Sequence, residues 1–291
     1  MGRPRQPLTK EYPVSTSRTR RAGAFAALAL VSTLALAACG SSDDGGSDAG
    51  ATNASGITTL ESGKLKVCTH LSYKPFQFKE GSDVVGFDVD LMDLVAKKLG
   101  LEQEIVDIDF AQITSGAVFA AKKCDAAAAG TTITDERKKA ILFSDPYFDA
   151  TQALIVKKGS GITDLAGLKG KKLGVQTDTT GQSYAEENKG ANGYEVVVFD
   201  DLSTEMAGVL AGRVDGAVND NGVVYDYAKD NPTTEVVKEF DTGEQYGLMF
   251  KLNDPNGQKL ADTANEVIKA AQTDGTYNTI YKKWFGVDAP K

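Results

Sequence analysis

The chain has 291 residues, of which 41 % are hydrophobic and 25 % are charged, so it carries enough apolar material for one large or two modest domains. Its 32 basic and 40 acidic residues give a formal net charge of −8, which argues against nucleic acid as a partner. The single histidine and three cysteines do not have the spacing of a metal site, and we expect neither a metal nor a cofactor.

Residues 1–38 have the pattern of an export signal. Arg18, Arg20 and Arg21 precede an apolar run that ends in small residues, and this order is typical of secretory signal peptides. An uncut anchor helix is the alternative interpretation of the same run. The run ends in Leu-Ala-Ala-Cys, which resembles the bacterial lipobox and implies a diacylglycerol on Cys39.

Residues 39–63 are predicted to form a flexible linker, because their small, polar and acidic side chains cannot bury enough surface to fold. Removing residues 1–38 takes away six basic residues and one acidic residue, which leaves 26 basic and 39 acidic residues and a net charge of −13. No later segment approaches the roughly 20 apolar residues that a membrane span needs. We therefore expect an extracytoplasmic protein that is anchored to the outer face of the cell membrane by lipid and does not cross it.

From residue 64 onward, strand and helix patterns alternate. The best-marked helix covers residues 86–100, with Asp88 and Asp90 at its start and two lysines at its end, as the helix dipole favours. The first series is, in chain order, strand 64–70, helix 86–100, strand 103–109, a helix near 112–123 and strand 124–130.

A second series follows residues 164–170. It contains, in chain order, strand 171–177, helix 179–188, strand 194–200, helix 202–213, strand 215–220, helix 221–230 and strand 234–240. Such alternation predicts βαβ units and parallel sheets, here in two α/β lobes.

Two β-rich segments, 148–158 and 240–250, are predicted to carry the chain between the lobes. The helical segments 257–275 and 276–286 are predicted to pack back on the first lobe. Two crossings make a hinge, and ligands of open α/β sheets bind outside the carboxyl ends of the strands. The predicted boundaries are 64–151 and 243–291 for lobe 1 and 152–242 for lobe 2.

Cys68 and Cys124 both fall in or beside predicted strands. An exported, oxidising setting permits a disulfide between them. If the two strands are parallel neighbours, their register places the sulfurs several residues apart, which opposes a bond. The sequence leaves both alternatives open.

Three motifs resemble those of the family 3 extracellular solute-binding proteins, the polar amino-acid receptors of ATP-driven importers. The motifs are GFDVDLMDLVAKKL (86–99), AGTTITDERKKAILFSDPYF (129–148) and GTYNTIYKKWFG (275–286), and the last two resemble the glutamine-binding members. The resemblance covers about residues 64–286 and implies a two-lobe periplasmic-binding-protein fold of type II, hinged on two β-strands. It also implies a free amino acid as ligand and a membrane permease as partner. We expect the helix of the first motif to be structural, without ligand contacts.

Arg137 follows a run of small and hydroxylated residues. Its planar guanidinium suits a carboxylate, but a surface position beside Asp135 or Glu136 is the alternative. The resemblance implies that Arg137 and Thr132 hold the carboxylate of the ligand. It also implies that the carbonyl of Gly130 accepts the ligand's ammonium group, and glycine lets a ligand approach its backbone closely.

The second lobe is predicted to complete this clamp. Thr179 and Thr180 open a helix whose free N–H groups and dipole attract an anion, and capping the helix is a compatible role. Asp220 ends a strand and matches the family's ammonium-binding aspartate, with a solvated turn aspartate as the alternative. Because these groups belong to different lobes, the ligand makes its full set of contacts only when the cleft is shut, and this drives closure.

The sequence is less informative about the residues that contact the ligand's side chain. The resemblance places Tyr73 and Phe110 as aromatic walls around it, with core packing as the alternative. His70 stands where glutamine-binding members have an acidic residue, and it is either a ligand contact or a strand-end residue. Gln176 replaces a lysine of some relatives, and Asp178 replaces a usual glycine. We expect a polar amino acid such as glutamine or glutamate.

Two other functions remain open from the sequence. The same family includes exported cyclohexadienyl dehydratases, which need a general acid in the cleft, and His70 or Asp178 are candidates. No nucleophile–base pair or metal set supports catalysis, however, so we expect a binding protein rather than an enzyme. An accessory to a separate membrane sensor is the second alternative.

Overall fold

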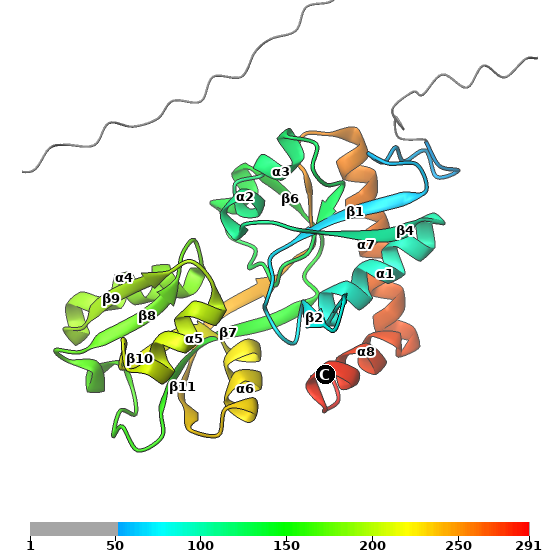
Figure 1. Ribbon diagram of the computed structural model, residues 1–291. Helices are drawn as coiled ribbons and strands as arrows, with labels where there is room; N and C mark the ends of the chain where they lie inside the picture. Colours follow the sequence, from blue (N-terminus) through cyan, green and yellow to red (C-terminus); the bar gives the residue numbers. More distant parts are fainter. Residues whose placement is uncertain (1–51, 291) are drawn as a thin grey trace, which may run out of the picture. The chain divides into compact units, whose positions relative to one another are not determined.

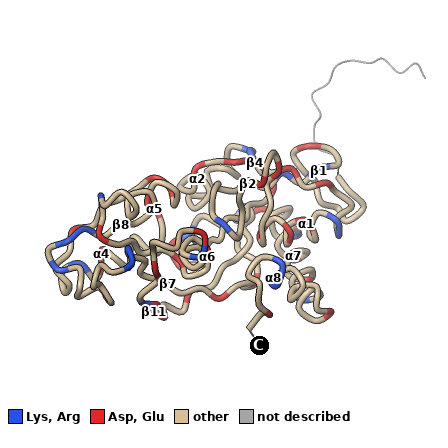
Figure 2. The backbone as a smooth tube through the Cα atoms, turned by 60° about the horizontal axis from the view of Figure 1, so that its bottom comes forward, with Lys and Arg blue, Asp and Glu red and all other residues tan. Residues whose placement is uncertain are grey.

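The computed structural model describes residues 52–290 (Figure 1). The predicted signal peptide, the predicted lipid site at Cys39 and most of the predicted linker lie outside the described residues. None of the helices within residues 52–290 combines the length and the apolar character that a membrane crossing requires. Acidic and basic residues are interspersed along the backbone (Figure 2).

The first sheet has five strands in the order β4-β1-β5-β12-β6. Strand β1 pairs in parallel with β4 and β5, whereas β12 pairs antiparallel with β5 and β6. Because β12 comes from near the end of the chain, it ties the last part of the sequence to this sheet. The strands are β1 Lys64–Thr69, β4 Glu102–Asp107, β5 Ala126–Ala127, β6 Ile141–Phe143 and β12 Met249–Lys251, and a small hairpin β2 Phe78–Glu80 and β3 Asp83–Val85 lies outside the sheet.

Helices cover this sheet much as the sequence predicts. The predicted helix 86–100 is α1, Phe87–Leu99, and it ends at Gly100, which has a left-handed conformation with φ 69°. It contacts α7, Pro255–Asp274, and α8, Thr276–Phe285, so both C-terminal helices pack back on the first sheet as predicted.

The predicted helix near 112–123 is wrong in its continuity. It is split into α2, Phe110–Thr114, and α3, Ala117–Ala120, by Gly116, whose φ is 73°. An added Cβ at Gly116 would lie 2.7 Å from the carbonyl oxygen of Ala140, so a close backbone approach requires glycine at this break.

The second sheet also has five strands, in the order β11-β7-β10-β8-β9. Strand β8 is parallel to β9 and β10, but β7 is antiparallel to β10 and to β11. The strands are β7 Phe148–Lys157, β8 Lys172–Gln176, β9 Glu195–Phe199, β10 Gly216–Asp220 and β11 Thr234–Tyr246. The helical segment η1 Arg137–Lys139 precedes β6 of the first sheet, and the helical segments beside the second sheet are η2 Leu165–Leu168, α4 Thr180–Asn192, α5 Leu202–Ala211 and α6 Asn221–Asp230.

The parallel pairing predicted from the strand–helix alternation does not extend to the crossing strands. The chain enters the second sheet through β7 and leaves it through β11, so the two strands run side by side in opposite directions. Strand β11 is also continuous, whereas the sequence suggested a strand and a separate connection.

Two α/β lobes joined by two strands are confirmed (Figure 1). We call the part around the first sheet lobe 1, the part around the second sheet lobe 2, and the strands β7 and β11 the hinge. The predicted change-over points, between residues 151 and 152 and between 242 and 243, fall inside these two strands. The exact points of change remain a prediction.

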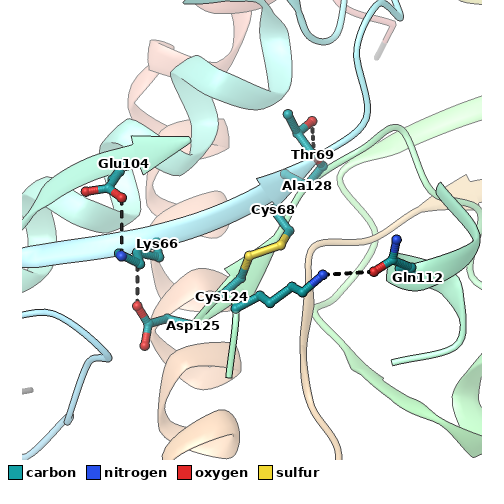
Figure 3. Close-up of a disulfide and its surroundings, with 9 residues drawn as sticks. Lys66, Cys68, Thr69, Glu104, Gln112, Cys124, Asp125 and Ala128 are labelled. Carbon is teal, nitrogen blue, oxygen red and sulfur yellow. Dashed lines mark hydrogen bonds and ion pairs between the residues drawn. A yellow bond between two sulfur atoms is a disulfide. The ribbon is translucent and has the colours of Figure 1, made fainter. Parts of the chain in front are cut away.

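A disulfide joins Cys68 and Cys124, whose Cα atoms are 5.6 Å apart (Figure 3). The parallel register pairs Cys68 with Ala127. If β5 were long enough to include Cys124, this register would keep the two sulfurs several residues apart, as the sequence argument expected. Strand β5, however, begins only at Ala126, and Cys124 precedes it. The left-handed Lys122, with φ 52°, turns the chain after α3 and brings Cys124 back toward β1.

Candidate functional site

A small, largely closed cavity lies where the two lobes meet. Its wall comes from the carboxyl ends of β1, β5, β8 and β10 and from the first residues of α2, α4 and η1. All ten ligand-binding residues predicted from the sequence line this cavity, although their role in binding remains a proposal. They are His70, Tyr73, Phe110, Gly130, Thr132, Arg137, Gln176, Thr179, Thr180 and Asp220, and the cavity is also lined by Gln77 and Ala129.

Arg137 faces the cavity rather than its acidic neighbours in the sequence. Asp135 and Glu136 pair with Lys138 and Lys139, and none of the ion pairs among residues 52–290 includes Arg137. Its guanidinium donates from Nη1 to the carbonyl oxygen of Thr132 at 2.8 Å and from Nη2 to that of Asp178 at 2.9 Å. Two backbone carbonyls, one from each lobe, thus aim the guanidinium and leave its positive charge available to an anion.

The guanidinium of Arg137 also lies over an aromatic ring and is partly buried from solvent. Its central carbon lies 5.3 Å from the ring centroid of Phe110, a distance typical of cation–π contacts. Burial lowers the pKa of Arg137, whereas the carboxylates of Asp220 and Glu244 act in the opposite direction. Arginine remains protonated in proteins, so the cavity holds a cation.

Asp220 provides the opposite charge. It is 5 % exposed and accepts hydrogen bonds from the hydroxyls of Tyr73, at 2.8 Å, and Tyr246. The amide of Gln152 donates to its other oxygen at 2.5 Å. Burial, together with the nearby charge of Glu244, raises the pKa of Asp220 to about 6. Asp220 is therefore a buried carboxylate and not the solvated turn residue that was the alternative.

Gly130 has a left-handed conformation that places its backbone against the cavity. Its φ is 54°, and an added Cβ would lie 2.8 Å from the ring of Tyr73. Its N–H donates to Oδ2 of Asp88 at 2.7 Å, while Oδ1 of Asp88 accepts the hydroxyl of Tyr147 at 2.7 Å. Burial raises the pKa of Asp88, which is 1 % exposed, to about 7.

Sequence reasoning missed Asp88 because it treated the first motif as a purely structural helix. The residue lies on the buried face of α1 with Leu91, Met92 and Val95. An acidic residue at an apolar position of an amphipathic helix was the signal that pointed to it, since a buried carboxylate needs donors.

The threonines combine helix capping with side-chain contacts across the lobes. Thr179 caps α4 by accepting the N–H of Gln182 at 3.0 Å, as predicted. The hydroxyls of Thr132 and Thr180 both donate to one oxygen of Glu244, at 2.9 and 2.8 Å. Glu244 was not predicted as a site residue, because the sequence placed it in a plain connection between lobes.

Three further polar side chains, those of His70, Gln77 and Gln176, line the same cavity. Nδ1 of His70 is 3.1 Å from the carbonyl oxygen of Ile108 and so carries the proton, which leaves Nε2 buried without a partner in the described chain. Gln77, 1 % exposed, donates from Nε2 to the carbonyl of His70 at 3.3 Å. Its Oε1 is likewise unpartnered among the described residues, as is that of Gln176. His70 follows the end of β1 and lines the cavity, so its strand-end position is compatible with the ligand contact, which stays a prediction.

Comparison with known proteins gives a family match over nearly all of the described chain. The model of the bacterial extracellular solute-binding proteins, family 3, matches residues 65–287. The chain is 34 % identical over 257 residues to the arginine-binding extracellular protein ArtP of Bacillus subtilis (strain 168), covering 87 % of this chain and 93 % of that protein. It is 34 % identical over 277 residues to the ABC transporter glutamine-binding protein GlnH of the same strain, covering 91 % and 97 %.

Solved structures agree in fold. An ancestral arginine-binding protein bound to arginine is 41 % identical, with a TM-score of 0.71, over 77 % of this chain and 99 % of that chain. The structure of an ancestral arginine-binding protein bound to glutamine gives the same values.

Proposed function

Because the chain belongs to the bacterial extracellular solute-binding proteins of family 3, we propose that it captures a free amino acid outside the cell and delivers it to the membrane permease of an ABC importer. The matched family model describes solute-binding proteins and the relatives are named for amino-acid binding, so the expectation of a binding protein rather than an enzyme is confirmed. The relatives give the dehydratase alternative no support.

The observation that carries the proposal is the pairing of one cation and one buried carboxylate in a cavity shared by both lobes. Arg137 and the N–H groups at the start of α4 suit the carboxylate of an amino acid. Asp220 and the carbonyl of Gly130 suit its ammonium group. A free zwitterion matches both ends, whereas a residue within a peptide chain lacks the two charges.

The unpartnered acceptors among the cavity-lining side chains favour a ligand side chain that donates hydrogen bonds. When the imidazole is neutral, Nε2 of His70 is an acceptor, and Oε1 of Gln77 is an acceptor because its amide nitrogen is engaged. A guanidinium or an amide can donate to both, but the carboxylate of glutamate cannot. Of the two ligands expected from the sequence, glutamine therefore fits these acceptors better than glutamate.

Charge favours arginine as the first candidate ligand. Asp220 and Glu244 oppose the single charge of Arg137, and a zwitterionic head group adds no net charge. A cationic side chain would compensate the remaining negative charge, and such attraction is strong in a partly desolvated cleft. A relative and a solved structure named for arginine agree with this choice.

The test is calorimetric titration of the full chain with four ligands: L-arginine, L-citrulline, L-glutamine and L-glutamate. We expect affinity to decrease in that order, since citrulline keeps the shape of arginine without its charge. If the chain binds amino acids but binds glutamate most tightly, only the proposed side-chain preference is contradicted. Failure of every standard amino acid to raise the melting temperature would contradict the proposed function itself.

The lipid anchor is a further part of the proposal, and it depends on residues outside the described range. Cleavage before Cys39 and lipidation of its thiol would tether the binding body beside the permease. The variant Cys39→Ser, expressed in a bacterium that processes lipoproteins, should appear in the soluble extracytoplasmic fraction instead of the membrane fraction. Unchanged membrane association would favour the uncut anchor helix.

A further inference from the structure

Glu244 lies at the point where hydrogen bonds from both lobes converge. It belongs to β11 of the hinge, two residues before the end of that strand. Its Oε2 accepts the hydroxyl of Thr132 from lobe 1 at 2.9 Å and the hydroxyl of Thr180 from lobe 2 at 2.8 Å. Its Oε1 accepts the hydroxyl of Thr242 at 2.9 Å. One carboxylate thus accepts hydrogen bonds from residues of both lobes and of the hinge.

Gln152 connects this carboxylate to Asp220. Its amide nitrogen is 2.5 Å from Oδ1 of Asp220 and 3.2 Å from each carboxylate oxygen of Glu244. An amide has two N–H groups, enough to donate to both acids, and Oγ1 of Thr180 lies 3.3 Å from the same nitrogen. Gln152 is fully buried in β7, and it therefore holds the two carboxylates at a short, defined separation within the hinge.

The bonds to Glu244 set how the two threonines face the cavity. A hydroxyl has one proton to donate, and in both threonines that proton goes to Glu244. Their Oγ1 atoms lie 3.5 Å apart across the lobes, and both side chains line the cavity. Separating the lobes would take at least one hydroxyl away from the shared oxygen, so the arrangement exists only when the lobes are together.

We propose that Glu244 is a positioning residue for amino-acid binding: it holds a threonine from each lobe on one carboxylate oxygen and so favours the shut cleft. This role rests on the function proposed above. It extends the clamp from groups that touch the ligand to a hinge residue that orders them.

The charge of Glu244 also acts on Asp220. After burial, it is the largest cause that raises the pKa of Asp220, and Tyr73, Tyr246 and Gln152 act against it through hydrogen bonds. The other charged groups near Asp220 are Arg137 in lobe 1 and Glu205 in α5. Removing the charge of Glu244 should therefore lower the pKa of Asp220 and extend binding to lower pH.

The same strand offers a matched control. Glu239, also on β11, accepts the hydroxyls of Thr151 at 2.9 Å and Tyr225 at 2.6 Å. It is exposed and does not line the cavity. Glu239→Gln therefore makes the same chemical change in the same strand without touching the proposed arrangement.

The experiment measures L-arginine and L-glutamine affinity of the full chain from pH 4.5 to 8 for wild type, Glu244→Gln, Glu244→Asp and Glu239→Gln. We expect Glu244→Gln to weaken binding roughly tenfold at pH 7.5, as loss of a charged acceptor implies, and to shift the acid limb to lower pH. Glu244→Asp keeps the charge, so it should weaken binding without moving the acid limb. Glu239→Gln should match wild type in both.

A second measurement does not depend on ligand. Small-angle X-ray scattering of the ligand-free full chain should give a larger radius of gyration for Glu244→Gln than for wild type or Glu239→Gln. Unchanged affinity and scattering, or tighter binding by Glu244→Gln, would overturn the role of Glu244 while leaving the proposed function intact. If no amino acid binds wild type, the proposed function fails, and scattering alone still decides whether Glu244 holds the lobes together.

Discussion

Asp88 of lobe 1 and Glu205 of lobe 2 are fully buried acids that do not line the cavity, but the two are used differently. Asp88 of lobe 1 receives two donors, the N–H of Gly130 and the hydroxyl of Tyr147. Glu205 of lobe 2 is fully buried and receives only the amide of Asn219, at 2.7 Å. Burial raises the pKa of Asp88 to about 7 and that of Glu205 to about 8.

The difference follows from how each lobe presents its site groups. In lobe 2, Thr180 opens the long helix α4 shortly after β8, and Asp220 ends the five-residue strand β10. In lobe 1, Gly130 and Arg137 lie beyond a strand of only two residues. An irregular segment needs side-chain acceptors and cross-links to stay in place, so we expect lobe 1 to be the more sensitive to mutation.

The largest expected effect comes from the disulfide of lobe 1. The double variant Cys68→Ala, Cys124→Ala removes a cross-link that spans 56 residues, and chain entropy predicts a loss of about 4 kcal/mol in the free energy of unfolding. Denaturant titration measures the loss, and hydrogen exchange should locate it around β1 and β5. Equal loss of protection in lobe 2 would contradict the contrast between the lobes.

Next in size is Asp88→Ala, which leaves the buried N–H of Gly130 and the hydroxyl of Tyr147 without their acceptor. We expect a loss of about 3 kcal/mol in stability and weaker ligand binding, with Asp88→Asn retaining most of both. Because the pKa of Asp88 is raised above its unfolded value, its contribution to stability is full at low pH and is lost as pH rises through about 7. Asp88→Asn should remove this part of the pH dependence.

Arg137→Ala should reduce amino-acid affinity roughly 100-fold, since it removes charge-assisted bonds to a carboxylate. The melting temperature without ligand should change little. Arg213→Ala is the control, because that exposed guanidinium lies over Phe199 in lobe 2, 5.2 Å from its ring centroid. If calorimetry finds wild-type affinity in Arg137→Ala, the proposed clamp is contradicted.

Glu205→Gln should have a smaller effect of about 1 kcal/mol at neutral pH, because the amide oxygen can still accept from Asn219. Its pKa is raised in the folded state, so its stabilising contribution is complete below the unfolded value and disappears as pH rises through about 8. The variant should therefore gain stability relative to wild type between neutral and mildly alkaline pH. Thermal unfolding across this range measures the gain. Its absence would show that burial does not raise the pKa of Glu205.

The smallest expected effect lies on the surface between the lobes. Lys74 of lobe 1 pairs with Asp226 at 3.2 Å and Asp230 at 2.6 Å on α6 of lobe 2. Exposed pairs contribute roughly 0.5 kcal/mol, so Lys74→Met should weaken binding about twofold in low salt, and this difference should fade in high salt. Lys98→Met, which removes a 4.0 Å pair to Glu266 within lobe 1, is the control. A loss that persists in high salt would point to packing instead of charge.

Local patterns were enough to predict most of the elements, and together with the resemblance to a family they predicted ten of the twelve residues that line the cavity. Helix α1 is marked by its apolar face and by Gly100, and α4 and α6 begin at Thr180 and Asn221, where the sequence predicts junctions between strands and helices. These features depend on neighbours within a few positions, so they can be read directly from the chain. The grouping of site residues also relied on resemblance to a family, because spacing alone allowed Arg137 to be a surface residue.

Contacts between distant residues were decided only by the tertiary structure. The break at Gly116, the reach of Cys124 to Cys68 and the antiparallel run of β7 and β11 each depend on segments far apart in sequence. The same holds for Glu244, which has no local feature of a binding residue and acquires its place because Thr132 and Thr180 arrive from different lobes. Local periodicity determines elements, but the environment of a carboxylate is determined by whichever donors the fold brings to it.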